Sequence, residues 1–138
     1  MPAPILLFLP AHDEADAVGA VVQRVPHTVL GHPVHCLVID DGSADDTALV
    51  AAAAGAEVLQ VGTNRGLGAA VRTGLREGVD RGAAAVVFCD ADGEYAPEEL
   101  ERLVAPILEG RADYVVGSRF AHGLPRHMRF HRMVGNRL

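Results

Sequence analysis

The chain has no lysine and only two cysteines among its 138 residues. Its fixed positive charge therefore comes from arginine alone. Cys36 and Cys89 both lie in apolar runs, which favours buried free thiols in a reducing compartment over a disulfide or a metal pair. No apolar run approaches the ~18 residues of a membrane-spanning helix. The first residues lack a positive region and a small-residue cleavage site, so we expect no signal peptide.

What the chain does contain is an acidic body with a basic end. Residues 1–110 carry 6 arginines and 17 acidic residues, whereas residues 111–138 carry 6 arginines and one acid, Asp113. The net charge of -6 hides this asymmetry. It indicates either a polyanionic partner, such as phosphate groups or a membrane surface, or pairing of the arginines with the body's own acids. Composition favours neither alternative.

Apolar runs typical of buried strands alternate with segments of helical spacing. Strands are predicted at residues 4–9, 34–39, 58–61, 86–89 and 114–116, with a helix after each of the first four. This βαβαβαβαβ pattern predicts an α/β fold with a mostly parallel sheet and helices on both faces. The length suits a single domain with its own core.

Polar residues near the predicted helix starts have an ordinary structural explanation. His12 or Asp13 can cap the first helix, and Ser43 can cap the second with Asp46 as its third residue. Gly66 and Gly68 open the third helix, and their spacing favours a tight loop over a phosphate-binding loop. These patterns alone do not indicate a ligand.

The segment after the predicted strand at residues 86–89 carries the strongest chemical signal. Asp90 and Asp92 stand at positions i and i+2, so in an extended chain both side chains point the same way. Two carboxylates at one point suit a hard cation such as Mg²⁺ or Mn²⁺, and Mg²⁺ commonly shares its ligands with substrate phosphates. The alternative is a solvated turn with two chance acids, and the spacing alone does not decide between them.

Four predicted strands end in polar groups, at residues 10–14, 40–41, 90–92 and 118–119. The carboxyl ends of parallel strands lie at one edge of a sheet, where α/β proteins bind ligands. An arginine at such an end, here Arg119, suits a diphosphate because its planar fork matches phosphate oxygens. This convergence predicts a metal–diphosphate site more firmly than any one motif.

Five ordered blocks carry a family resemblance: LPAHDEAD, VIDDGSADDT, NRGLGAAVRTGL, CDADGEYAPEEL and DYVVGSRF. They resemble the blocks of family 2 GT-A glycosyltransferases, and are most similar to the branch that transfers mannose or glucose to polyprenyl phosphates. The resemblance runs from Pro4 to about Phe120. It implies a Rossmann-like GT-A fold, a nucleoside-diphosphate sugar donor of the GDP-mannose or UDP-glucose type, Mg²⁺ or Mn²⁺, and inversion at the anomeric carbon.

The resemblance also implies roles for individual residues. Those that would line the nucleoside pocket are Pro10, Ala11, His12, Glu14, Ile39 and Asp41. Asp90, Ala91 and Asp92 would form the metal–diphosphate motif, with Asp92 the candidate catalytic residue, and Arg119 would approach the donor phosphates. His12 departs from the family, where a tyrosine is usual, so base preference or affinity can differ.

The family normally extends well beyond the matching region. The resemblance therefore implies a donor-binding domain at residues 1–120, followed at 121–138 by the start of an acceptor region in a truncated or minimal member. We expect a polyprenyl-phosphate acceptor, no nucleic-acid partner, and a cytoplasmic location, with peripheral attachment to the inner membrane face left open. Two alternatives remain: a nucleotide-sugar-binding module without catalysis, and, with less support, a haloacid dehalogenase-like phosphatase.

Overall fold

The computed structural model describes residues 2–93 and 96–115 of the chain. The chain divides into two compact units, residues 1–101 and 102–138. The candidate site lies in the first of them. The predicted domain boundary at residue 120, and the basic segment after it, lie outside the described residues. No helix in the part that the structure describes is long and apolar enough to span a bilayer.

Strands and helices alternate through the first unit. The strands are β1 (Ile5–Ala11), β2 (Thr28–Val29), β3 (His32–Asp40), β4 (Glu57–Gln60) and β5 (Ala85–Phe88). The helices are α1 (Val18–Gln23), α2 (Thr47–Ala53), α3 (Leu67–Asp80), the short 3₁₀ helix η1 (Pro97–Glu99) and α4 (Leu100–Leu108), which ends in the second unit.

The sheet is mostly parallel, which confirms the predicted fold class. β1 pairs with β3 on one side and β5 on the other, and β4 pairs with β3, all in parallel. The two-residue β2 pairs antiparallel with the start of β3 and was not predicted. Its two residues are too few to show a periodic pattern. No strand is assigned to Tyr114 and Val115, and the rest of the predicted fifth strand lies outside the described residues.

Strand β1 is the centre of the sheet. Residues 5–9 are each at most 1% exposed, because β1 has a strand on either side and helices over both faces. A strand buried on both faces reads as a continuous apolar run, which is why the ILLFL segment could be recognised. This central strand delivers residues 10–14 to the carboxyl edge of the sheet.

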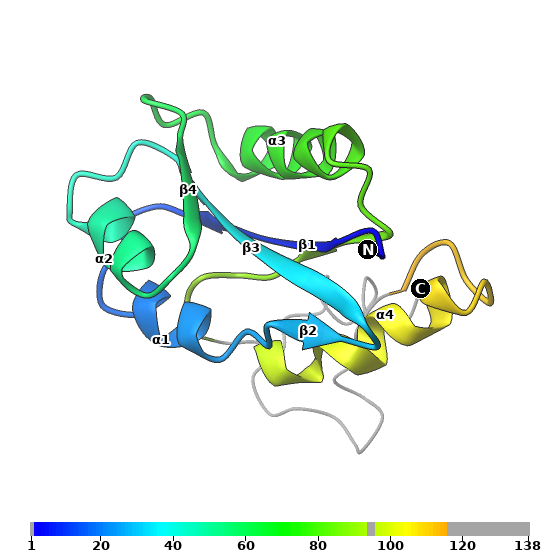
Figure 1. Cartoon of the computed structure of the whole chain (residues 1–138). Coiled ribbons are helices and arrows are strands. Elements are labelled where there is room, and N and C mark those ends of the chain that lie inside the picture. The colour runs from blue at the N-terminus through cyan, green and yellow to red at the C-terminus, as the bar shows by residue number, and fades with distance from the viewer. Residues whose placement is uncertain (1, 94–95, 116–138) are drawn as a thin grey trace, which may run out of the picture. The chain divides into compact units, whose positions relative to one another are not determined.

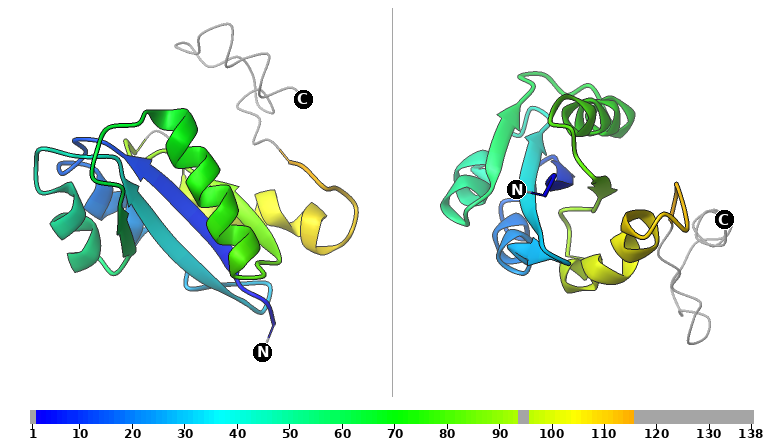
Figure 2. Two further views of the ribbon diagram at one scale, coloured as in Figure 1. Left: turned by 90° about the horizontal axis from the view of Figure 1, so that it is seen from above. Right: turned by 45° about the vertical axis from the view of Figure 1, so that its right-hand side comes forward.

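Helix α3 covers one face of the sheet, and α1 and α2 lie together on the other (Figures 1 and 2). Two glycines let α3 approach closely. A Cβ on Gly74 would stand 2.3 Å from the Phe8 ring, and one on Gly78 would stand 2.2 Å from a methyl group of Val86. Because contacts this short are forbidden, the absence of both side chains sets the height of α3 above β1 and β5.

Helices α1 and α2 begin later than the sequence predicts. The first begins at Val18 rather than near Asp13, and the second begins at Thr47 rather than after Ser43. Asp13 has φ of 52°, a left-handed conformation that cannot continue into a helix. The predicted caps at His12 or Asp13 and at Ser43 are therefore wrong, and these residues lie in the loops that form the candidate site.

Candidate functional site

Three of the four predicted strand ends meet at one edge of the sheet. Register pairs Ala11 of β1 with Asp40 of β3, and the amide of Asp41 donates to the carbonyl of Ala11 over 2.9 Å. On the other side of β1, the amide of Cys89 donates to the carbonyl of Phe8 over 3.1 Å. Backbone pairing thus brings residues 10–14, 40–41 and 89–92 to a common edge. The fourth end, with Arg119, lies outside the described residues.

Asp41 is buried at this edge, with 5% of its surface exposed. Its two carboxylate oxygens accept hydrogen bonds from the amides of Arg65 and Gly66, at 2.8 and 2.9 Å. Gly66 has φ of 90°, which turns the loop so that its amide faces the carboxylate. Asp41 therefore anchors the loop that leads into α3, because one charged carboxylate accepts strong hydrogen bonds from two of its backbone amides.

His12 is held against the same residue. Its Nδ1 lies 2.9 Å from the carbonyl oxygen of Asp41, and since a carbonyl only accepts, Nδ1 carries the proton in this contact. Nε2 lies 3.3 Å from a carboxylate oxygen of Asp13. The residue is otherwise exposed. The imidazole is thus fixed in orientation and keeps an accessible surface.

Hydrogen bonds join the loop after β1 to the segment between β3 and α2. The amide of Asp13 donates to the hydroxyl of Ser43 over 2.9 Å, and the amide of Ala44 donates to a carboxylate oxygen of Asp13 over 2.8 Å. The amide of Glu14 donates to the hydroxyl of Thr47 over 2.9 Å. The predicted capping residues Asp13 and Ser43 therefore join two loops 30 residues apart in the chain.

The acids after β5 stand near Glu14 of the loop after β1. Burial raises the pKa of the Glu14 carboxyl first, and the negative charges of Asp92, Asp45 and Asp90 raise it further. Asp92 is exposed and Asp90 is half-buried, whereas Ala91 between them is buried. Ala91 and Asp92 form a turn rather than the extended chain that the sequence predicts, so a shared direction of the two carboxylates does not follow from strand alternation.

The donor set at this edge fits a hard cation. Asp90 and Asp92 supply only carboxylate oxygens, which Mg²⁺ and Mn²⁺ prefer. No group of three His, Cys, Asp or Glu side chains is arranged to hold a metal in residues 2–93 and 96–115. Two carboxylates with substrate phosphates are the usual Mg²⁺ environment, so the residues present fit a cation bound together with a diphosphate.

Both cysteines are free, as predicted. Cys36 in β3 is half-buried and Cys89 after β5 is buried. Burial is the main cause that raises the pKa of Cys36 to about 12 and that of Cys89 to about 11. Thiols with such high pKa values are neutral at physiological pH, so neither is activated as a nucleophile.

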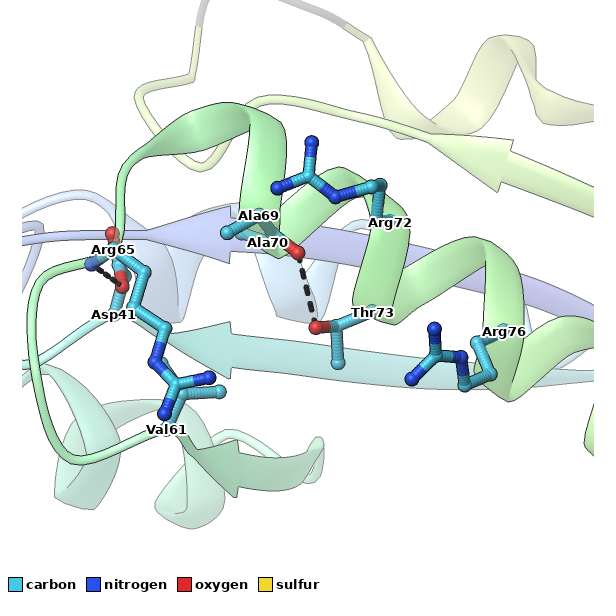
Figure 3. A pocket seen from close by; sticks show the side chains of 8 residues that line it. All are labelled: Asp41, Val61, Arg65, Ala69, Ala70, Arg72, Thr73 and Arg76. Carbon is cyan, nitrogen blue, oxygen red and sulfur yellow. Dashed lines mark hydrogen bonds between the residues drawn. The ribbon is translucent and has the colours of Figure 1, made fainter.

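Beside Asp41 the structure holds a pocket that the sequence did not predict. Its volume is about 180 Å³ (Figure 3). Arg65, Arg72 and Arg76 line it together with smaller side chains of α3. Arg72 and Arg76 are four residues apart on α3, and this spacing could have predicted that they share one face of the helix.

The chain matches a known family over nearly its whole length. The sequence profile of Glycosyl transferase family 2 matches residues 7–134. The chain belongs to this family. The phosphatase alternative fails here, since the match includes the segment with Asp90 and Asp92 on which that alternative depended.

Named relatives lie in the polyprenyl-phosphate branch that the resemblance indicated. The chain is 40% identical to the polyprenol monophosphomannose synthase of Mycolicibacterium smegmatis, over 86% of this chain and 46% of that protein. It is 36% identical to the undecaprenyl-phosphate mannosyltransferase of Micrococcus luteus, over 86% and 49%. The chain thus spans about half the length of these relatives.

Among solved structures, the chain resembles glucosyl-3-phosphoglycerate synthase from Mycobacterium tuberculosis. In a complex of that enzyme with Mn²⁺, UDP-glucose and phosphoglyceric acid, the TM-score is 0.67 and the identity is 31%. The superposition covers 83% of this chain and 43% of that one. The likeness supports the same α/β architecture in both proteins.

Proposed function

We propose that this chain carries the donor-binding half of a glycosyltransferase that moves a sugar from a nucleoside-diphosphate sugar to a polyprenyl phosphate, with inversion. The observation that carries this is the meeting of the loops after β1, β3 and β5 at one sheet edge, in a chain of family 2. Both mannosyltransferase relatives are named for polyprenyl-type acceptors. This function places the protein at the inner face of the membrane, where such acceptors are held.

The loops after β1 and β3 are assigned to the nucleoside. Pro10 and Ala11 are the last residues of β1 and His12 follows them, while Ile39 lies near the end of β3 and Asp41 directly follows that strand. The imidazole of His12, fixed by the Asp41 carbonyl, supplies a flat surface on which a base can stack. Glu14 extends this lining toward the acids after β5, because the charges of Asp92 and Asp90 add to the effect of burial on the pKa of its carboxyl.

Asp90 and Asp92 are assigned to a divalent metal that neutralises the diphosphate leaving group when bound. Asp92 is the catalytic residue of the proposal because its carboxylate would hold the divalent metal beside the reacting centre. An acceptor phosphate oxygen attacks the anomeric carbon, and the bond from that carbon to the nucleoside diphosphate breaks with inversion. No proton has to be removed, since the acceptor is already an anion. Arg119 is assigned to the donor phosphates.

Titration calorimetry with UDP and GDP, in Mn²⁺ and in EDTA, tests the proposal. Mn²⁺ should strengthen nucleotide binding, and Asp92→Asn should reduce that gain by about tenfold or more, since it removes a metal ligand. Asp80→Asn at the end of α3 is the matched control, because it removes the same charge away from the site. Equal nucleotide affinity in Mn²⁺ and EDTA would contradict the metal assignment.

Transfer is tested separately from binding. Purified chain, labelled GDP-mannose or UDP-glucose, and a polyprenyl phosphate in detergent should give a labelled lipid product. Metal-dependent nucleotide binding without product would favour the alternative of a nucleotide-sugar-binding module. Hydrolysis of the donor without lipid product would support a working donor site and place acceptor binding outside this chain.

A further inference from the structure

Three arginines meet at the pocket between α3 and the end of β3. Arg65 belongs to the loop before α3, and Arg72 and Arg76 belong to the helix itself. In Figure 3 the side chains of Arg72 and Arg76 both point back toward the start of α3, and Arg65 reaches toward Val61. Arg72 Nη1 lies 3.6 Å from where a Cβ on Gly68 would stand, so this guanidinium lies over the first turn.

This gathering is unusual in an acidic body. Residues 1–110 contain six arginines against 17 acids, and three of the six line this one pocket. Others are engaged: Arg24 pairs with Glu98, and Arg81 pairs with Glu57 over 2.8 Å. Within residues 2–93 and 96–115, the guanidinium groups of Arg65, Arg72 and Arg76 make no hydrogen bond or ion pair.

Asp41 is the one acid among the residues that line the pocket. Its oxygens already accept the amides of Arg65 and Gly66, so the carboxylate serves the backbone. Thr73 likewise donates its hydroxyl proton to the carbonyl of Ala69 over 3.0 Å. The pocket therefore keeps a surplus of positive charge, and the mutual repulsion of its arginines would be relieved by a bound anion.

We propose that this pocket binds a phosphate group, as a second anion site separate from the acids after β5. Guanidinium forks match phosphate oxygens in pairs, and three of them can surround a group of this size. The site needs no metal, because its own charge is positive. It holds whether or not the chain transfers a sugar. The phosphate can come from a soluble phosphate compound or from a lipid headgroup, which share this chemistry.

Titration calorimetry with inorganic pyrophosphate in EDTA tests the soluble form. The double variant Arg72→Gln/Arg76→Gln should weaken binding by about tenfold or more, since it removes two charged donors. The control Arg24→Gln/Arg111→Gln lowers the net charge equally at two arginines that do not line the pocket, and should change the affinity by less than about twofold.

Co-sedimentation with vesicles of phosphatidylcholine, with and without phosphatidylglycerol, tests the lipid form with the same variants. If the pocket double variant loses binding to vesicles but keeps binding to pyrophosphate, the site is assigned to a lipid headgroup. If it loses binding to pyrophosphate but keeps binding to vesicles, the site is assigned to a soluble phosphate. Either result supports the site. The proposal would be overturned if the pocket variant and the control variant lost binding equally. It would also be overturned if the pocket variant bound both pyrophosphate and vesicles as well as the unchanged protein does, or if the unchanged protein bound neither. Circular dichroism melts confirm that each variant is folded.

Discussion

The ends of β3 and β5 carry similar sequences but form different structures. Strand β3 ends at Asp40 and is followed by Asp41-Gly42, and β5 is followed, after Cys89, by Asp90-Ala91-Asp92-Gly93. Asp41 is buried and holds two amides of a distant loop, whereas Asp92 is exposed. An acid followed by glycine at a strand end can thus be a structural anchor or a group presented to solvent. The surrounding loops decide which.

The largest expected difference between the segments that follow β3 and β5 is in their effect on the stability of the fold. Asp41→Ala removes the acceptor of two amides in the part-buried loop and should lower the free energy of unfolding by about 2–4 kcal/mol. Asp92→Ala removes an exposed carboxylate and should change it by less than about 0.5 kcal/mol. Urea unfolding of both variants measures this, and equal losses would show that the two ends do not differ as described.

Asp41→Ala should also weaken binding of UDP and GDP without metal, because it releases the loop and removes a lining residue of the proposed nucleoside pocket. Asp41→Asn keeps one acceptor oxygen and should give intermediate values for both properties. Unchanged affinity in a folded Asp41→Ala variant would remove Asp41 from the proposed nucleoside site and leave its structural role intact.

The two glycines offer the next test. Gly42 has φ of 71° and Gly93 has φ of 82°, so alanine is strained at either position. A Cβ at Gly42 would also stand 2.8 Å from the amide nitrogen of Asn64, whereas the nearest atom at Gly93 is 4.0 Å away. Gly42→Ala should therefore lower the free energy of unfolding by about 1–2 kcal/mol more than Gly93→Ala does. Urea unfolding checks this, and equal losses would contradict the close approach of the loops.

The thiol of Cys36 predicts a pH dependence within β3. Its pKa is raised by burial to about 12, so between pH ~8.5 and that value the unfolded chain ionises this thiol and the folded chain does not. Stability from this group is complete below pH ~8.5 and falls as pH rises, by about 1–2 kcal/mol at pH 10. Cys36→Ser should lack this loss. The free energy of unfolding of both proteins is measured by urea unfolding from pH 8 to pH 10. An equal dependence on pH in the two proteins would contradict the role of the Cys36 thiol.

The smallest expected effect concerns His12. His12→Tyr restores the aromatic residue usual in the family but loses the Nδ1 contact with the Asp41 carbonyl. Stability should fall by about 0.5–1 kcal/mol, the net contribution of one hydrogen bond. Affinity for UDP against GDP should shift by a few-fold if this residue stacks on the base. An unchanged ratio of the two affinities would place His12 outside the base pocket.

Much of the sheet could be predicted because its strands are rich in apolar residues, most clearly β1, whose residues 5–9 are all buried. β1, β3, β4 and β5 appear as apolar runs bounded by turn residues, and α3 follows glycines that open it. The later starts of α1 and α2 could not be read from local patterns, since the capping residues bond across two loops instead. Ser43 looks like a helix cap in either case, and only its partner Asp13 distinguishes the two arrangements.

The sequence by itself determined the alternation of the longer strands with helices and the acids at three strand ends. These follow from short-range patterns of burial and from the rule that parallel strands share a carboxyl edge. Tertiary structure alone decided that Asp41 anchors the loop before α3 and that Arg65, Arg72 and Arg76 share a pocket. The partners of Asp41 lie 24 and 25 residues further along the chain, and only the packing of α3 on the sheet brings them within hydrogen-bonding distance.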